Sequence, residues 1–200
     1  CRYRYAESGL PRPSWDLWEE RRGVHAWTVG ATWGGLQAAA NFAEAFGETA
    51  LATKYRGVAE EIKAGVRDHL MSSQMDCFAR TIKREDDGTW LHDTTMDASL
   101  VGLWAFGMFA PEAPEIVATM ARMRDRLWVK TDVGGMARYE DDYYHQVTDD
   151  VDEIPGNPWF ICTLWLAQWH IAKASSPADL APAQDILIWV ADRDMRSGVM

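Results

Sequence analysis

The chain has 200 residues, a formal net charge of −10 and 48% hydrophobic residues. This apolar fraction supports a hydrophobic core and excludes an intrinsically disordered chain. The negative charge disfavours nucleic acid as a partner, because binding to phosphates needs a positive protein surface. No run of about 18 apolar residues is present, so we expect no membrane span. The chain begins with Cys1 and has no basic-then-apolar leader, which we interpret as a missing N-terminus.

Three segments can be distinguished at the start of the chain. Residues 1–23 are rich in Pro, Gly, Arg and Trp without helical period, and they predict a loop. Residues 26–46 are nearly all small or apolar around the whole circumference, which is the pattern of a helix buried on every side. After Gly47, residues 50–71 carry apolar side chains at steps of three and four, with charged residues between them. That spacing predicts an amphipathic surface helix.

The same pair of patterns recurs twice. Residues 98–109 and 159–172 are almost wholly apolar, and each is followed by an amphipathic stretch, 114–127 and 180–191. Helices that alternate between buried and surface positions fit two concentric rings, because an inner helix has neighbours on all sides and an outer one meets water. The sequence therefore predicts an all-α fold of about six helices that alternate between inner and outer positions.

Two long connections separate these pairs. Residues 72–95 contain Asp86-Asp87-Gly88, which indicates the turn of a short hairpin. Residues 128–157 are far longer than the usual connection between helices, and a loop of that length is normally functional or disordered. Because it holds Arg138, four aromatic residues and many acidic ones, we expect an ordered, functional loop.

Eleven tryptophans are the most unusual feature of the composition. An indole has a flat apolar face and one N–H group, which suits sugar rings with apolar C–H faces and hydroxylated edges. A large aromatic core is an equal alternative. Four of the tryptophans lie within helical patterns and are expected in the core: Trp104, Trp165, Trp169 and Trp189.

The strongest local signal is the segment 13–21, which reads Pro-Ser-Trp-Asp-Leu-Trp-Glu-Glu-Arg. Three carboxylates and two indoles lie within six residues just before a predicted buried helix: Trp15, Asp16, Trp18, Glu19 and Glu20. They favour a concave, partly dry, acidic pocket. In such a pocket, desolvation and like charges raise the pKa of one carboxyl group and suit it to general acid catalysis. The alternative is an acidic cap at the N-terminus of a helix.

The sequence contains no pattern for a metal or a cofactor, and we expect neither. Cys1, Cys77 and Cys162 have no metal-ligand spacing, so we interpret them as free buried thiols of a reducing compartment such as the cytoplasm. The five histidines also lack ligand spacing. The acidic residues between 140 and 153 lack a calcium-loop pattern, and a solvated acidic face is the preferred interpretation.

Three blocks of sequence resemble glycoside hydrolase family 15, the glucoamylase, glucodextranase and trehalase family. The first block is Pro-Ser-Trp-Asp-Leu-Trp-Glu-Glu-Arg-Arg-Gly-Val-His at 13–25. The second is Gly-Gly-Met-Ala-Arg-Tyr-Glu at 134–140, and the third is Ile-Pro-Gly-Asn-Pro-Trp-Phe-Ile-Cys-Thr-Leu-Trp at 154–165. Because the blocks stand in the family's order and spread over most of the chain, the resemblance is specific.

The resemblance implies an (α/α)6 barrel with its active site at one end, of which residues 1–200 would be an incomplete catalytic domain, roughly helices six to eleven. It implies an inverting glycoside hydrolase of the glucoamylase type that releases glucose from α-glucosides, with a trehalase or glucodextranase of the same family as alternatives. Three other interpretations stay open. They are an unrelated trehalase or phosphorylase on a helical barrel, a non-catalytic sugar-binding protein, and a structural helical domain.

The resemblance also assigns roles within the first block. Glu19 would be the general acid that protonates the glycosidic oxygen. Asp16 and Glu20 would hold sugar hydroxyl groups, and Trp15 and Trp18 would line the sugar-binding cleft. Where many relatives carry Tyr, this chain has Trp15, which keeps the aromatic platform and loses a hydroxyl group.

The later blocks supply two further residues. Arg138 would hydrogen-bond the substrate around the scissile bond, with a surface ion pair as the alternative, and Trp159 would wall the cleft near the leaving-group sugar. Asn157-Pro158 fits a helix N-cap followed by proline at the first helical position. The family's general base would follow Met200, so we expect the 200-residue chain alone to be inactive. The expected partner is an α-linked glucoside (an oligosaccharide, a starch-like glucan or trehalose), with no nucleic acid and no membrane.

Overall fold

The computed structural model describes residues 3–198. They form two compact units, and each is described by itself: residues up to 94 together with 102–119, and residues 95–101 together with those from 120 onward. Over the described residues the chain contains six α-helices, two short 3-10 helices and six short strands. The predicted all-α class therefore accounts for the helices but is wrong for the strands.

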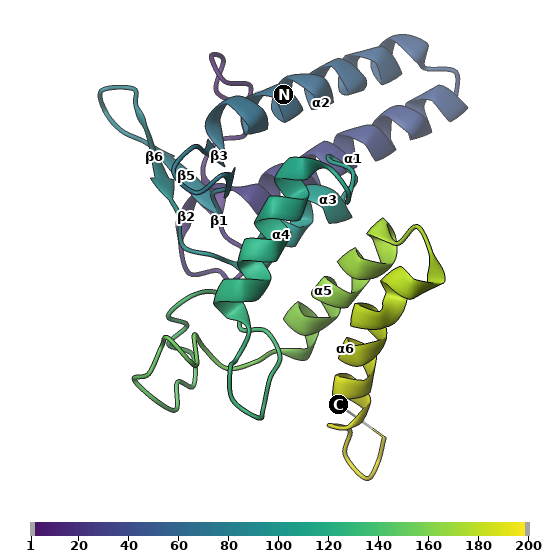
Figure 1. Ribbon diagram of the computed structural model, residues 1–200. Coiled ribbons are helices and arrows are strands. Elements are labelled where there is room, and N and C mark those ends of the chain that lie inside the picture. Colours follow the sequence, from purple (N-terminus) through teal and green to yellow (C-terminus); the bar gives the residue numbers. More distant parts are fainter. Residues whose placement is uncertain (1–2, 199–200) are drawn as a thin grey trace. The chain divides into compact units, whose positions relative to one another are not determined.

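Two long helices dominate the first unit and lie side by side (Figure 1). They are α1 (Ala26–Ala45) and α2 (Thr49–His69). Their buried positions include small side chains, which let helix backbones approach closely, among them Ala40, Ala43, Ala52 and Ala59. The short helix α3 (Gly102–Ala105) packs on α1. A Cβ atom on Gly30 would lie 2.6 Å from the carbonyl oxygen of Gly102, so this crossing requires glycine.

The predicted helices at 26–46 and 50–71 agree closely with α1 and α2. The expectation that the first is buried on every side is wrong within its unit, because Phe42 is 68% exposed. In that unit α1 packs on α2, α3 and β2, and its outward side meets solvent. The predicted helix at 98–109 is also shorter than expected. It divides into the 3-10 helix η1 (Ala98–Val101) and α3, and Gly107 with a φ of 84° follows the end of α3.

The first unit also contains a four-stranded antiparallel sheet. Its strands, in the spatial order β1-β2-β5-β6, are Ser14–Trp15, Arg22–His25, Thr81–Arg84 and Trp90–Asp93. The hairpin expected around 86–88 is confirmed as β5–β6, whereas the loop predicted for residues 1–23 omitted β1 and β2. A second pair consists of β3 (Met71–Ser72) and β4 (Cys77–Phe78). Strands of two to four residues are too short for an alternating pattern to be recognised in the sequence.

The second unit contains another pair of neighbouring helices. α5 (Phe160–Lys173) is followed by the 3-10 helix η2 (Pro177–Leu180) and by α6 (Ala181–Ala191). Helix α4 (Pro114–Leu127) contributes its residues up to 119 to the first unit and the remainder to the second. All three α-helices lie where the sequence predicted them. Of the four expected core tryptophans, Trp169 is fully buried and the other three are half-buried.

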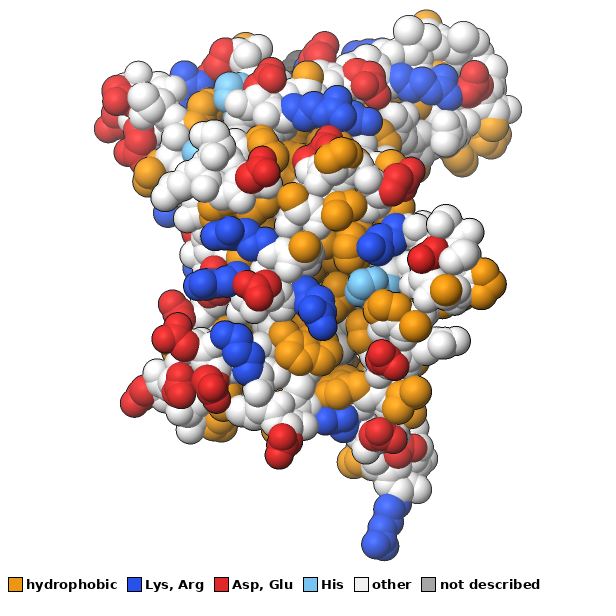
Figure 2. Space-filling model, in the orientation of Figure 1, with side chains coloured by type: hydrophobic (Ala, Val, Ile, Leu, Met, Phe, Trp, Pro, Cys, Tyr) orange, Lys and Arg blue, Asp and Glu red, His pale blue; other side chains and the backbone are white. Residues whose placement is uncertain are grey.

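The segment 128–157 is a folded loop within the second unit. An isolated β-bridge joins Trp128 to Met136, and the Lys130 N–H donates a 3.0 Å hydrogen bond to the Glu153 carbonyl oxygen. Acidic side chains gather over this segment on the face shown in Figure 2. Of the acidic residues between 140 and 153, five are exposed, as expected for a solvated acidic face: Asp141, Asp149, Asp150, Asp152 and Glu153. Two residues are exceptions. Glu140 is half-buried and pairs with Arg126, and Asp142 is 1% exposed.

Two other sequence-based expectations concern the thiols and the membrane. Cys77 and Cys162 are buried, as predicted, whereas Cys1 lies outside the described residues. Among residues 3–198, no helix has the length and apolar character that crossing a bilayer requires.

Candidate active site

The acidic segment forms a loop between two paired strands. β1 and β2 pair through Ser14 with Gly23 and Trp15 with Arg22, which leaves residues 16–21 as the connection. The Asp16 N–H donates to the Arg21 carbonyl oxygen at 2.9 Å and closes the loop. Helix α1 begins only after β2, so the alternative interpretation as a helix N-terminal cap is wrong.

The three carboxylates of this loop have different surroundings. The side chains of Asp16 and Glu20 are 10% and 16% exposed, and their oxygens lie 3.7 Å and 2.9 Å from Arg21 Nη1. Glu19 is exposed, and its φ of 59° lies in the left-handed region, which non-glycine residues rarely adopt. The partly dry pocket expected around Glu19 is therefore not formed by the first unit alone. The loop instead separates one accessible carboxylate from two that lie beside an arginine.

The two indoles of the acidic segment also differ. Trp15 is 59% exposed, so its ring face is open to a ligand, whereas Trp18 is half-buried. His25, at the end of β2, is buried. Its Nε2 donates a 3.2 Å hydrogen bond to the Ser14 carbonyl oxygen, and its Nδ1 forms a hydrogen bond with Thr81 Oγ1. His25 thereby ties the base of the loop to β5.

Arg138 is the centre of a second group, which lies in the second unit. Its Nε and Nη2 donate 2.7 Å hydrogen bonds to the two carboxylate oxygens of Asp142. The guanidinium carbon lies 5.1, 5.0 and 5.3 Å from the ring centroids of Tyr139, Tyr144 and Trp159. Arg138 is 6% exposed, so the alternative interpretation as a surface ion pair is wrong. A buried guanidinium held by a bidentate carboxylate and three rings has a fixed orientation.

Asp142 is a member of this group that the sequence analysis missed. It was grouped with the solvated acidic residues, yet it both pairs with Arg138 and accepts a 3.0 Å hydrogen bond from the Tyr144 N–H. A Cβ atom on Gly156 would lie 2.6 Å from the Asp142 Cβ, so glycine is required there. The spacing of four residues between Arg138 and Asp142 was the available signal.

Trp159 and Asn157 connect this group to α5. The Trp159 backbone N–H donates to the Met136 carbonyl oxygen at 2.8 Å, and its indole Nε1 is buried without a partner among the described residues. Trp159 itself is the N-cap residue of α5, and no side-chain cap is present. The predicted N-cap role of Asn157 is therefore wrong; its amide donates instead to the carbonyl oxygens of Tyr144 and His145 at 3.0 and 2.7 Å.

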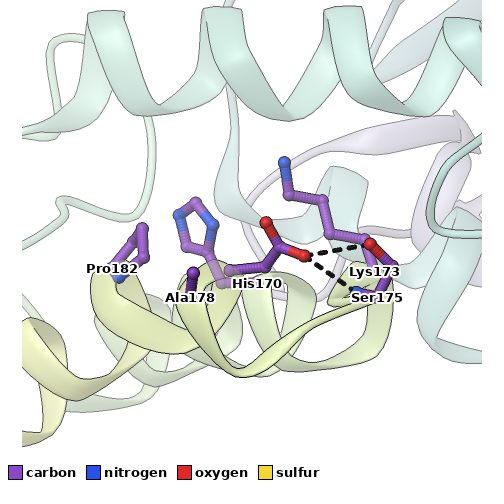
Figure 3. A pocket seen from close by; sticks show the side chains of 6 residues that line it. His170, Lys173, Ser175, Ala178 and Pro182 are labelled. Carbon is purple, nitrogen blue, oxygen red and sulfur yellow. Dashed lines mark hydrogen bonds between the residues drawn. The ribbon is translucent and has the colours of Figure 1, made fainter.

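A pocket of about 350 Å³ lies elsewhere in the second unit (Figure 3). None of the predicted site residues belongs to its lining, which consists of His170, Lys173, Ser175, Ala178, Asp179 and Pro182. The Asp179 carboxylate accepts hydrogen bonds from the N–H and hydroxyl groups of Ser175 and Ser176, and it caps η2. Burial, followed by the positive charges of Lys173 and Arg124, lowers the pKa of His170.

The fold class is defined by likeness to a solved structure. The crystal structure of a bacterial glucoamylase complexed with acarbose aligns with this chain at a TM-score of 0.65 and 21% sequence identity. The alignment covers 84% of this chain and 28% of that chain. At this identity the likeness concerns the fold alone.

The family is shown by the sequence itself. Residues 3–180 match the glycosyl hydrolases family 15, and the chain belongs to this family. An uncharacterized glycosyl hydrolase of Methanocaldococcus jannaschii is 31% identical over 79% of this chain and 23% of its own length. A trehalase of Mycobacterium tuberculosis is 27% identical over 93% of this chain and 26% of its own length. The chain thus spans about a quarter of the length of these relatives.

Proposed function

We propose that the protein is an inverting glycoside hydrolase that releases glucose from α-glucosides, with Glu19 as its general acid. Membership of glycosyl hydrolases family 15 supports a glycosidase in general. One observation carries the assignment of the acid: the loop 16–21 holds Asp16 and Glu20 beside Arg21 and leaves the carboxylate of Glu19 accessible. A general acid must reach the bridging oxygen of its substrate, and an accessible carboxylate meets that requirement.

The reaction needs two carboxyl groups on opposite sides of the sugar. In an inverting enzyme one carboxylic acid protonates the leaving oxygen, while a carboxylate about 6.5–9.5 Å away activates a water molecule. Glu19 would supply the proton. We assign no residue of this chain as the general base.

The other residues are proposed to bind the sugar. Trp15 offers an open ring face suited to the apolar side of a glucose ring. Trp18 and Glu20, in the adjoining loop, are proposed to contact the same sugar. Arg138 and Trp159 are also proposed to bind sugar, Arg138 through a guanidinium whose orientation is fixed by Asp142. We also propose that the helix pairs belong to an (α/α)6 barrel, which the family and the glucoamylase-like fold support.

The test measures hydrolysis by the complete gene product and the anomeric configuration of the glucose that it releases. Maltose, isomaltose and trehalose are offered separately, since one relative bears the name trehalase and the fold resembles a glucoamylase. Proton NMR follows the anomer that appears first. We expect the glucose unit whose anomeric bond is cleaved to appear first as β-glucose. With trehalose the leaving sugar appears as α-glucose in addition, because its own anomeric configuration is unchanged. Initial release of the cleaved unit as α-glucose, or sugar binding without hydrolysis of any of the three, would contradict the proposal.

A further inference from the structure

The backbone at Glu19 adopts a conformation that needs support. Its φ of 59° is left-handed, and glutamate lacks the short side chain with which Asn or Asp can hydrogen-bond locally in that region. The loop also contains no glycine between positions 16 and 21 to relieve the strain. Something in the loop must therefore hold Glu19 in this conformation.

Asp16 makes the contacts that do so. Its carbonyl oxygen accepts a hydrogen bond from the Glu19 N–H at 3.2 Å, and its Oδ1 accepts one from the Glu20 N–H at 2.8 Å. These two N–H groups belong to the peptide units on either side of the Glu19 Cα atom. Because both peptide units are tied to one residue, the φ and ψ angles of Glu19 are fixed, and so is the direction in which its side chain leaves the loop.

The carboxylate of Asp16 is engaged inside the loop. Oδ1 is occupied by the Glu20 N–H, Oδ2 lies 3.7 Å from Arg21 Nη1, and the side chain is 10% exposed. Such a group is poorly placed to bind a sugar hydroxyl. We infer that Asp16 is a positioning residue that aims the carboxyl group of Glu19, rather than a sugar-binding residue. This inference rests on the proposed role of Glu19 as general acid.

A substrate that needs no proton separates the two roles of Asp16. The leaving group of α-glucosyl fluoride departs as a stable anion without protonation, whereas the leaving sugar of maltose or trehalose needs the general acid. Proton donation by a positioned side chain contributes about 10²–10⁴-fold to a rate. Substitution of a residue that only orients the general acid should slow hydrolysis of the natural substrate far more than hydrolysis of the fluoride. A residue that holds the sugar affects both alike.

The experiment compares kcat/KM for α-glucosyl fluoride and for the best natural α-glucoside, using the complete gene product. Asp16→Ala should lower kcat/KM for the α-glucoside about 100-fold and kcat/KM for the fluoride less than about 5-fold. Glu19→Gln should show the same selective loss on the α-glucoside. Asp16→Asn keeps an oxygen acceptor for the Glu20 N–H and should retain activity on the α-glucoside within about 10-fold of the unsubstituted protein.

Asp87→Ala is the matched control. Asp87 Oδ1 accepts a 2.8 Å hydrogen bond from the Thr89 N–H in the β5–β6 turn, so this variant loosens another hairpin of the same unit. We expect its activity on both substrates to be unchanged.

The outcomes distinguish the inference from the proposed function. If Glu19→Gln lowers kcat/KM selectively for the α-glucoside while Asp16→Ala lowers kcat/KM equally for both substrates, the positioning role of Asp16 is wrong. If Glu19→Gln itself shows no selective loss, the proposed function fails. If Asp16→Ala does not fold, the Asp16→Asn variant provides the test. An equal loss of kcat/KM on both substrates in Asp16→Asn also overturns the inference.

Discussion

Arg138 and Asp142 form a buried bidentate ion pair, with Nε to Oδ2 and Nη2 to Oδ1 both at 2.7 Å. Their side chains are 7% and 0% exposed. Within the second unit this pair determines where the guanidinium group points, and three aromatic rings surround it. The carboxylate therefore has a structural role that is separable from any contact with substrate.

Asp142→Ala is expected to destabilise the protein strongly. Removal of the Asp142 carboxylate breaks a buried bidentate ion pair, and such a change typically costs about 3–5 kcal/mol. Asp149→Ala, at an exposed position of the same loop, serves as the control and should change stability by less than about 0.5 kcal/mol. Urea denaturation followed by tryptophan fluorescence measures both. Equal unfolding midpoints for the two variants would show that the ion pair contributes little.

Gly135→Ala should also be destabilising. Gly135 has a φ of 84°, and an added Cβ would lie 2.5 Å from Trp189 Cζ2 and 2.9 Å from the Pro158 Cβ. The left-handed backbone disfavours alanine by about 1–2 kcal/mol, and overpacking adds about 1–3 kcal/mol. Gly35→Ala is the opposite case, since it lies in α1 with no atom within 4 Å of an added Cβ. We expect it to stabilise by about 0.5–1 kcal/mol. Thermal melts of both variants provide the comparison, and a stabilised Gly135→Ala would contradict the packing described for Trp189.

His170 is expected to make stability depend on pH. Burial and the nearby positive charges of Lys173 and Arg124 lower its pKa below the ordinary value of 6.5, while the Asp179 carboxylate lines the same pocket. The unfolded chain therefore takes up the proton first as the pH falls. The free energy of unfolding therefore has its full value above pH 6.5, as far as His170 is concerned. It decreases as the pH falls from 6.5 toward the pKa of His170 in the folded state.

His170→Gln removes this dependence. The free energy of unfolding of the unsubstituted protein should fall further than that of His170→Gln between about pH 7.5 and about pH 5.5. The other histidines are present in both proteins, so the difference isolates His170. Identical pH dependence in the two proteins would show that its environment does not perturb it.

The long periodic segments were predictable from the sequence, and the short or solvent-facing ones were not. Helices α1, α2, α4, α5 and α6 follow directly from the spacing of their apolar residues. The strands β1 and β2 were missed because two to four residues contain too few alternations to distinguish them from a loop. The length of the short helix α3 was overestimated, because the apolar run continues past Gly107, where the backbone departs from helical geometry.

The candidate site was predictable in its residues but not in its contacts. The acidic block and Arg138 were recognisable from residue types and from resemblance to the family. Three facts required coordinates: Asp142 lies buried among exposed acids, Asn157 bonds to the loop instead of capping α5, and Glu19 has a left-handed backbone. Each depends on tertiary hydrogen bonds between residues several positions apart, which composition and periodicity do not encode.

The most direct test of the account is kcat for the complete gene product carrying Glu19→Gln, measured with the α-glucoside that it hydrolyses best. Glutamine keeps the size of the side chain and cannot donate a carboxylic acid proton, so kcat should fall about 10²–10⁴-fold. Glu85→Gln, in the turn between β5 and β6, is the control and should keep full activity. A Glu19→Gln protein that retains kcat within about 3-fold of the unsubstituted protein would contradict the assignment of Glu19 as general acid.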